Sequence, residues 1–457
     1  MIFDVILPGL FLLGSLVFLH ELGHFLVAKW LRVPVYKFSL GFGPALFGFT
    51  RSETRYQISA LPLGGYVSMA EETKDADGKD DLVDRFSEQS WWKRFVIALA
   101  GPGANFVTGY VALIVMALVG VQLPDFDPVL GPIAADSPAA RAGLVEGTRI
   151  VRLGDAPVSS FRDFLTRAEA VPANRPVDFG LAGPDGSTRT LRVPAGEREG
   201  VLASLTPPEA PSVIGSVVLG NPAYGAGLAA ADRIVAIDGQ AVSRWRDLTT
   251  TITANAGKPL RFTVERAGRT FDVTITPQGP PSPGAWVGGR IGIEAPRERS
   301  YLVRSSLSEA VAGAWPTTQV LVGQTFGGLR TLFLRPFQSA GSLGGPQMIV
   351  QIAGQSAKRG LGDFIYVLAA ISFAIMAFNL IPLPILDGGH LFLALVEAVR
   401  RRPPAEWFTA VYQRVGLVVM GSFIVFVLFN DLSRSIQHRA AVQRNNQAPP
   451  GEVGPTR

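Results

Sequence analysis

The sequence contains no cysteine and only four histidines. Without cysteine the chain has neither disulfide bonds nor thiolate metal ligands, so any zinc site must use histidine and carboxylate side chains. The absence of cysteine does not identify the redox compartment of the protein. Three of the four histidines are informative, because His20 and His24 stand four residues apart and His390 belongs to a second motif far along the chain.

Charged residues are also scarce. They make up 17% of the 457 residues, compared with roughly a quarter in ordinary soluble domains, whereas 47% are hydrophobic and the mean hydropathy is +0.27. The net charge of +5 is small for this length and no basic face is evident, so nucleic acid is not expected as a partner. The composition predicts a polytopic α-helical membrane protein, which lies in a lipid bilayer and has an additional water-soluble part.

Four segments are long and apolar enough to cross a bilayer, which takes about 20 residues. These segments are residues 5–30, 95–121, 364–386 and 411–429. The first segment lacks a basic region before it and a small-residue cleavage site after it, so we interpret it as a retained span and not as a signal peptide.

Basic residues beside the spans predict the orientation of the chain. They follow the first span, precede the second, and lie between the third and the fourth. The positive-inside rule places these loops in the cytoplasm. Both termini and the long segment of residues 122–363 then lie outside, in the periplasm if the cell is Gram-negative.

The first span contains the sequence HELGH at residues 20–24. Ionisable groups at membrane depth are costly and are functional candidates by default. Four residues apart on a helix, His20 and His24 share one face and can bind one zinc ion, and Glu21 between them can be a general base towards water. In a soluble chain such a short motif would more often be a chance match, but the apolar surroundings favour a metal site.

A catalytic zinc site needs a third protein ligand. The third span ends in NLIPLPILDGGH, residues 379–390. Pro382 and Pro384 prevent a regular helix, and irregular backbone at membrane depth is tolerated only where it lines a cavity or a site. An isolated Asp-Gly pair would be read as an ordinary surface turn; beside a zinc motif in a membrane, Asp387 is the candidate third ligand.

The segment between the second and third spans contains an internal repeat. Residues 137–155 and 221–239 share a Pro-Ala pair, then Ala-Gly-Leu, then Arg-Ile-Val, and Pro138 and Pro222 differ by 84 in residue number. A short helix, a glycine turn, an alternating strand and a tight hairpin account for the pattern. It resembles bacterial PDZ domains, which are small, β-rich α+β folds.

PDZ domains bind an extended peptide along a sheet edge, often with backbone amides of a loop around the terminal carboxylate. The candidate loops are residues 130–133 and 214–217. Peptide or protein segments are therefore possible partners of the repeats. The sequence leaves open the alternative that two small β-domains only block access to the membrane site.

The motifs together resemble the site-two protease family of intramembrane zinc proteases. HELGH lies in the first span, NxxPxPxLDG in the third, and the repeats lie between the second and third spans; residues 101–106 and 429–434 also match. The resemblance implies that zinc is the cofactor, with these roles: His20, His24 and Asp387 as zinc ligands, Glu21 as the base, and Asn379 as a contact to the substrate backbone.

The same resemblance implies a multi-pass protease of the bacterial inner membrane. Its substrates would be single-span membrane proteins that reach the site from the periplasmic side, including an anti-sigma factor in a regulated stress response and remnant signal peptides. A catalytically silent scaffold and a metal transporter are the alternatives. The intact Glu21 disfavours the scaffold, and the repeats would be unexplained in a transporter.

A helical substrate must be unwound before it can be cut. Residues 35–69 alternate apolar and polar side chains, which predicts β-hairpins that dip into the membrane from the cytoplasm and offer an edge to an extended substrate. A plain cytoplasmic loop is the alternative. Residues 307–334 and 346–357 have helical periodicity and could lie along the outer membrane surface, or could simply pack against the spans.

These observations divide the chain into six parts. They are the first two spans with the β-region (1–121), two PDZ domains (122–205 and 206–298), bordering amphipathic helices (299–363), the third and fourth spans (364–434), and a polar tail expected to be disordered (435–457).

Overall fold

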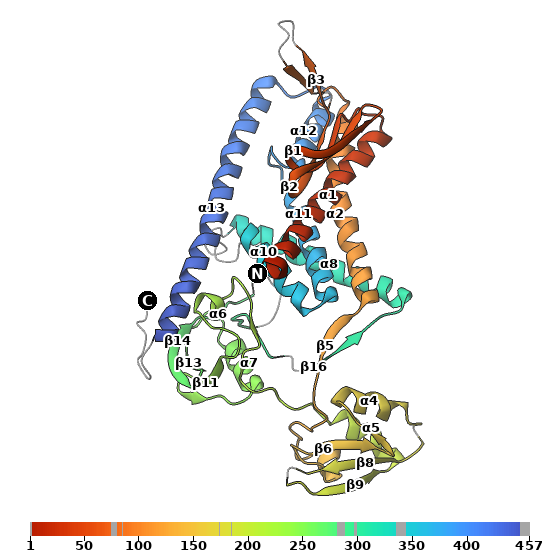
Figure 1. The fold of residues 1–457 in the computed structure, drawn as a ribbon, viewed down its shortest axis with the longest axis vertical. Coiled ribbons are helices and arrows are strands. Elements are labelled where there is room, and N and C mark those ends of the chain that lie inside the picture. The colour runs from red at the N-terminus through yellow and green to blue at the C-terminus, as the bar shows by residue number, and fades with distance from the viewer. Residues whose placement is uncertain are drawn as a thin grey trace. The chain divides into compact units, whose positions relative to one another are not determined.

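The computed structural model describes residues 2–74, 80–84, 86–172, 174–183, 185–280, 288–296, 299–334 and 344–447. These residues form two compact units (Figure 1). The helical unit contains the described residues up to Val121 and those from Val303 to Ile436. The repeat unit contains the remaining described residues, including the last turns of the C-terminal helix from Gln437.

Among the described residues, four helices are long and apolar enough to cross a membrane. They are Phe3–Trp30, which combines η1 (Ile2–Ile6) with α1 (Leu7–Trp30), and then α2 (Trp91–Val119), α11 (Leu361–Asn379) and α13 (Glu406–Gln447). The prediction of four membrane helices is therefore confirmed, with helix ends that differ from the expected ones.

The third span ends earlier than expected. Helix α11 stops at Asn379, and irregular chain precedes α12 (Asp387–Arg400). Pro382 and Pro384 account for this, since each lacks a backbone N–H and disfavours helical geometry in the residue before it. As a result Asp387 is the first residue of α12.

The polar tail is partly a helix. The expectation of disorder from residue 435 is wrong for residues 435–447, which continue α13. These turns are held by contacts inside the repeat unit: the Asn445 side chain donates to the Ala226 carbonyl at 2.9 Å, and the His438 ring stacks on Tyr224 with 3.8 Å between centroids. Polarity here reflects hydrogen bonding to protein and not only exposure to water. The expected disorder of residues 448–457 lies outside the described residues.

The spans of the helical unit approach one another closely at glycines. A Cβ on Gly23 of α1 would overlap the Ala100 carbonyl of α2, and a Cβ on Gly109 of α2 would lie 2.7 Å from the Phe373 ring of α11. Small residues let helix backbones meet where lipid provides no hydrophobic drive. The helices predicted at residues 307–334 and 346–357 are α8 (Leu307–Leu334) and α10 (Pro346–Arg359).

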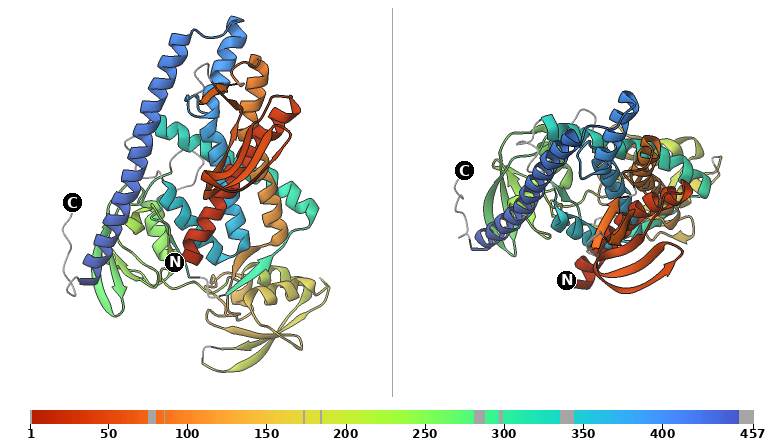
Figure 2. Two further views of the ribbon diagram at one scale, coloured as in Figure 1. Left: turned by 45° about the horizontal axis from the view of Figure 1, so that its top comes forward. Right: turned by 90° about the horizontal axis from the view of Figure 1, so that it is seen from above.

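The β-region consists of long hairpins, as predicted for residues 35–69. Strand β1 (Lys37–Arg51) pairs antiparallel with β2 (Thr54–Ser68), and β3 (Ala70–Lys74) pairs with β4 (Asp80–Asp84). The start of β1 pairs with both ends of β2, because Leu40 lies opposite Ile58 and Gly65. The last part of β2 is thereby placed at one edge of the sheet, and β2 packs against α1 (Figure 2).

Large apolar side chains of the hairpin lie on its surface. Leu46, Phe47 and Phe49 are 72%, 65% and 55% exposed. Large apolar side chains exposed in such number on one hairpin are unfavourable in water and are typical of a region that meets lipid or protein. Insertion of the hairpin into the bilayer remains a prediction.

The repeat unit contains two four-stranded sheets with the same strand order, β7-β6-β8-β9 and β12-β11-β13-β14. The first sheet consists of β6 (Arg149–Leu153), β7 (Ala156–Pro157), β8 (Val177–Ala182) and β9 (Thr188–Val193), with helices α3 (Pro138–Arg141), α4 (Phe161–Ala170) and α5 (Ala195–Ala203). The second consists of β11 (Arg233–Ile237), β12 (Gln240–Ala241), β13 (Leu260–Arg266) and β14 (Arg269–Ile275), with α6 (Pro222–Gly225) and α7 (Trp245–Ala254).

Equivalent elements of the two sheets keep the spacing seen in the sequence. The first residues of β6 and β11 differ by 84 in number, as do those of α4 and α7. Each copy has its own core, around Phe164 and Phe179 in the first and around Phe262 in the second. The internal repeat predicted from the sequence is thus confirmed. Two short ladders complete the unit: β5 (Val121–Asp125) with β16 (Arg299–Val303), and β10 (Ser216–Val217) with β15 (Ile293–Glu294).

Asp431 holds α13 against the start of α10. The side chain is buried, and Oδ1 accepts a hydrogen bond of 3.0 Å from the backbone N–H of Gly345, the N-cap residue of α10. A carboxylate is favourable at this end of a helix. We expect Asp431→Ala to lower the free energy of unfolding by about 1–3 kcal/mol, measured in detergent. Asp431→Asn retains an acceptor and should lose less; equal losses would contradict the hydrogen-bonding role.

Candidate metal centre

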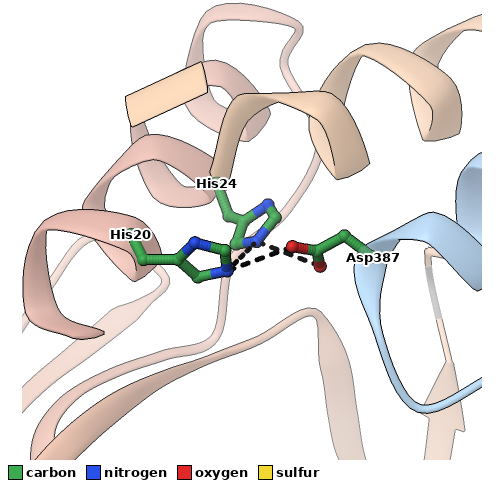
Figure 3. Close-up of side chains that lie close together, drawn as sticks. All are labelled: His20, His24 and Asp387. Atoms are coloured by element: carbon green, nitrogen blue, oxygen red, sulfur yellow. Dashed lines mark hydrogen bonds and ion pairs between the residues drawn. The ribbon is translucent and has the colours of Figure 1, made fainter. Parts of the chain in front are cut away.

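Three side chains converge from the first span and from the start of α12 (Figure 3). His20 Nε2 lies 3.0 Å from Asp387 Oδ2, His24 Nε2 lies 3.3 Å from Asp387 Oδ1, and the two Nε2 atoms lie 3.3 Å apart. Each residue offers one ligand atom, all within 4.8 Å of one another. The structure therefore brings together the three residues that the sequence selected as a metal site.

The distances fit a zinc ion. Two atoms that each lie about 2.0–2.1 Å from a tetrahedral zinc ion are about 3.3 Å apart, close to the spacings found here. His24 Nδ1 donates to the Ile97 carbonyl at 2.7 Å, which leaves Nε2 of His24 as a lone-pair donor facing Asp387. Asp387 Oδ2 is buried and no described group donates to it in hydrogen-bonding geometry. Two imidazoles and one carboxylate are a donor set that zinc accepts.

Helix α2 supports both imidazoles along one face. Ile97, Gly101 and Asn105 follow one another at intervals of four residues; the Ile97 carbonyl meets His24, and the Asn105 amide lies 3.0 Å from His20 Nδ1. A Cβ on Gly101 would lie 2.6 Å from His24 Cε1 and 2.7 Å from His20 Cε1. Residues 101–106 match the family pattern, but the match gives them no role. The four-residue spacing of Ile97, Gly101 and Asn105, which places them on one helix face, is the signal in the sequence that points to such a role.

Helix α2 also fixes the position of α12. Arg94, in the first turn of α2, forms an ion pair and hydrogen bond with Glu397 of α12, and both side chains are largely shielded. Charge-assisted contacts of this kind are stronger than neutral ones. They tie the helix that carries Asp387 to the helix that supports the histidines.

A cavity of about 490 Å³ opens beside the three residues. Its lining includes Glu21, His24 and Asp387, the end of β2 with the following residue (66–69), and His390. Glu21 lies within hydrogen-bonding reach of the Val67 amide. The carboxylate predicted to be a base therefore faces a space that reaches both the metal site and a strand edge.

Asn379 is placed differently from the other selected residues. It is the last residue of α11, is half-buried, and is not part of the lining of this cavity. Its contact with the substrate backbone remains a prediction.

Comparison with known proteins identifies the family. The model of peptidase family M50 matches residues 8–423. The chain belongs to peptidase family M50. This confirms the predicted resemblance to site-two proteases. The protein is therefore a zinc-dependent membrane metalloprotease. Membrane proteins are accordingly its substrates, and a lipid bilayer is its environment.

Relatives of known name cover almost the whole M50 chain. The regulator of sigma-E protease RseP of Salmonella typhimurium is 34% identical, and RseP of Escherichia coli is 32% identical; each alignment covers 92% of this chain and 97% of the relative. A protein of Neisseria meningitidis whose name includes "zinc metalloprotease" is 31% identical over 94% of this chain and 99% of its own length.

Proposed function

We propose that the chain is an intramembrane endopeptidase of the bacterial inner membrane that cleaves single-span membrane proteins, with His20, His24 and Asp387 as the zinc ligands and Glu21 as the general base. The observation that carries this proposal is the convergence of the three ligand atoms within 4.8 Å, on elements that belong to or adjoin membrane-spanning helices. Buried ionisable groups at such depth need partners, and here each is a partner of the others.

The residues divide the chemistry among them. When bound, zinc lowers the pKa of water and polarises a carbonyl. Glu21 takes a proton from the attacking water, whose oxygen bonds to the carbonyl carbon of the substrate. Glu21 then gives that proton to the amide nitrogen as the C–N bond breaks, so that an amine and a carboxylic acid leave. The cavity beside Glu21 is where the scissile peptide would lie.

The edge of β2 is suited to hold the substrate extended. Residues 66–68 of β2 line the cavity beside Glu21 and Asp387. An extended peptide paired with this edge would have its helix already opened at the point of cleavage. We propose that the β-hairpin region performs this unwinding, together with Asn379 at the broken end of α11.

The names of the relatives suggest the substrates. RseP of Salmonella typhimurium and of Escherichia coli are named as regulators of sigma-E. By similarity, we propose that the M50 chain acts in regulated intramembrane proteolysis on a membrane-anchored anti-sigma factor and on remnant signal peptides. The basic loops support a cytoplasmic location of the HELGH end and a periplasmic location of the repeats.

We propose that the two repeats are PDZ domains. The loops selected from the sequence do not suit peptide capture, because both are already paired: Gly131 N donates to Thr206 O at 2.9 Å, and Gly215 N donates to Glu294 O at 2.8 Å. A groove of about 640 Å³ is lined instead by both copies, with Phe126 and Pro132 from the first and Trp245, Arg246 and Glu294 from the second.

A strand beside a helix is the arrangement in which β-augmentation binds a peptide. This groove, which both copies line and which runs beside β15 and α7, is therefore a better candidate for a peptide site than either loop. The alternative that the repeats only restrict access remains.

Metal removal tests the proposed function. We expect cleavage of a purified single-span substrate, in detergent or in liposomes, to stop when a chelator removes zinc and to return when one zinc ion per chain is restored. The same substrate carrying a large folded periplasmic domain serves as the control for restricted access and should be cut poorly throughout. Cleavage that continues after zinc has been removed would contradict the proposal.

A further inference from the structure

The side chain of Asn105 meets the metal site from α2. Asn105 is fully buried; its Nδ2 lies 3.0 Å from His20 Nδ1, and its Oδ1 is buried with no hydrogen-bond partner among the described residues. Its backbone carbonyl accepts a hydrogen bond of 2.8 Å from Ser372 Oγ of α11. Because Asn105 lies within α2 and its side chain is fully buried, its amide has little freedom except to exchange the places of its oxygen and nitrogen.

The chemistry of His20 decides between the two amide orientations. Nε2 of His20 faces Asp387 and Nε2 of His24, so it is the nitrogen that would bind a metal ion. A neutral imidazole that offers Nε2 as a ligand carries its proton on Nδ1 and must donate it. An amide NH₂ beside Nδ1–H would place two donors face to face, whereas the amide oxygen would accept the proton.

The oxygen and nitrogen of an amide are assigned from their hydrogen-bond partners. Exchanging them places the oxygen opposite His20 Nδ1 and gives the unpartnered oxygen a donor. We propose that Asn105 is a positioning residue that accepts the Nδ1–H of His20 through Oδ1 and so holds Nε2 towards the metal. This rests on the proposed zinc site and adds to it the residue that orients one ligand.

Both histidines are then oriented in the same way, by an acceptor on α2 for the Nδ1–H. His24 Nδ1 donates to the Ile97 carbonyl and His20 Nδ1 donates to the Asn105 side chain, one helical turn on either side of Gly101. Acceptors of this kind fix the tautomer and the ring orientation of metal-binding histidines. Because Asn105 is fully buried, water has no ready access to replace a missing acceptor for His20 Nδ1–H.

Two substitutions of Asn105 test whether its side chain accepts or donates the hydrogen bond with His20 Nδ1. Asn105→Asp has nearly the same shape and, as a carboxylate, can only accept; Asn105→Leu has a similar volume and can do neither. We expect zinc affinity, measured by competition with a chelator in the purified full-length protein, to stay close to wild type in Asn105→Asp. In Asn105→Leu we expect it to fall about 10–100-fold.

Cobalt provides a second readout that does not depend on activity. The visible absorption spectrum of the Co²⁺-loaded protein reports ligand geometry, and we expect it to be unchanged in Asn105→Asp and altered in Asn105→Leu. Ser372→Ala is the matched control, because it removes the hydrogen bond to the Asn105 backbone and leaves the side chain in place. Its spectrum should match wild type.

The outcomes are distinct. If Asn105→Asp loses zinc as strongly as Asn105→Leu, the side chain donates, and the inference is overturned. Wild-type affinity in Asn105→Leu would overturn it as well. If Asn105→Leu does not fold, the comparison of Asn105→Asp with wild type decides alone. A wild-type protein that binds no zinc would instead overturn the proposed function, and this result differs from both outcomes for the Asn105 variants.

Discussion

Glu21→Gln is expected to lower the rate of substrate cleavage about 10²–10⁴-fold, the range over which a positioned general base contributes. Glutamine has the shape of glutamate but cannot take the proton of the attacking water. Glu21 is not one of the three residues whose ligand atoms converge, so zinc should remain at one ion per chain. Single-turnover cleavage of a single-span substrate and metal analysis of the same sample measure both quantities.

Glu53→Gln is the matched control for this substitution. Glu53 is in the same unit, at the turn between β1 and β2, and its side chain is half-exposed and paired with Lys29 at 2.7 Å. Because it lies outside the lining of the cavity, the same chemical change there should leave the rate unchanged. Undiminished cleavage by Glu21→Gln would exclude Glu21 as the base, whereas loss of zinc in this variant would show that it acts as a ligand.

The sequence could select His20, His24 and Asp387 because their signal is chemical. Polar groups inside apolar segments must have partners, and helical spacing places two of the three on one face. Proline chemistry also predicts that the helix is interrupted before Asp387. The sequence does not give the exact end of α11 at Asn379, because packing decides how far before Pro382 and Pro384 the helix stops.

Other features depended on partners far along the chain. The orientation of His20 depends on Asn105, 85 residues away, and no local pattern identifies which polar residue of a second helix will face an imidazole. The loop at Gly215 had the composition of a peptide-binding loop, but its amide is taken by Glu294 of the same chain. Polarity alone predicts a disordered tail, and it does not reveal the contacts of the tail with Ala226 and Tyr224.

Gly101→Ala is expected to weaken zinc binding and to lower the rate of cleavage by at least about 100-fold, since a displacement of about 1 Å at a reacting site can cost that much in rate. The new methyl group would overlap His24 Nε2, the nitrogen that faces Asp387, and would lie 2.7 Å from His20 Cε1. Neither ring can retreat freely, because His24 Nδ1 is held by the Ile97 carbonyl at 2.7 Å and His20 Nδ1 lies 3.0 Å from the Asn105 amide.

Gly103→Ala separates this steric effect from a general change in α2. Gly103 is two residues further along the same helix, and a Cβ there meets no atom of the described residues within 4 Å. Both substitutions raise helix propensity, by up to about 1 kcal/mol in an exposed helix, so neither should weaken α2 itself. Zinc affinity by chelator competition should therefore fall in Gly101→Ala and stay at the wild-type value in Gly103→Ala. Equal affinities in the two variants would show that the imidazoles do not depend on the space that Gly101 leaves for them.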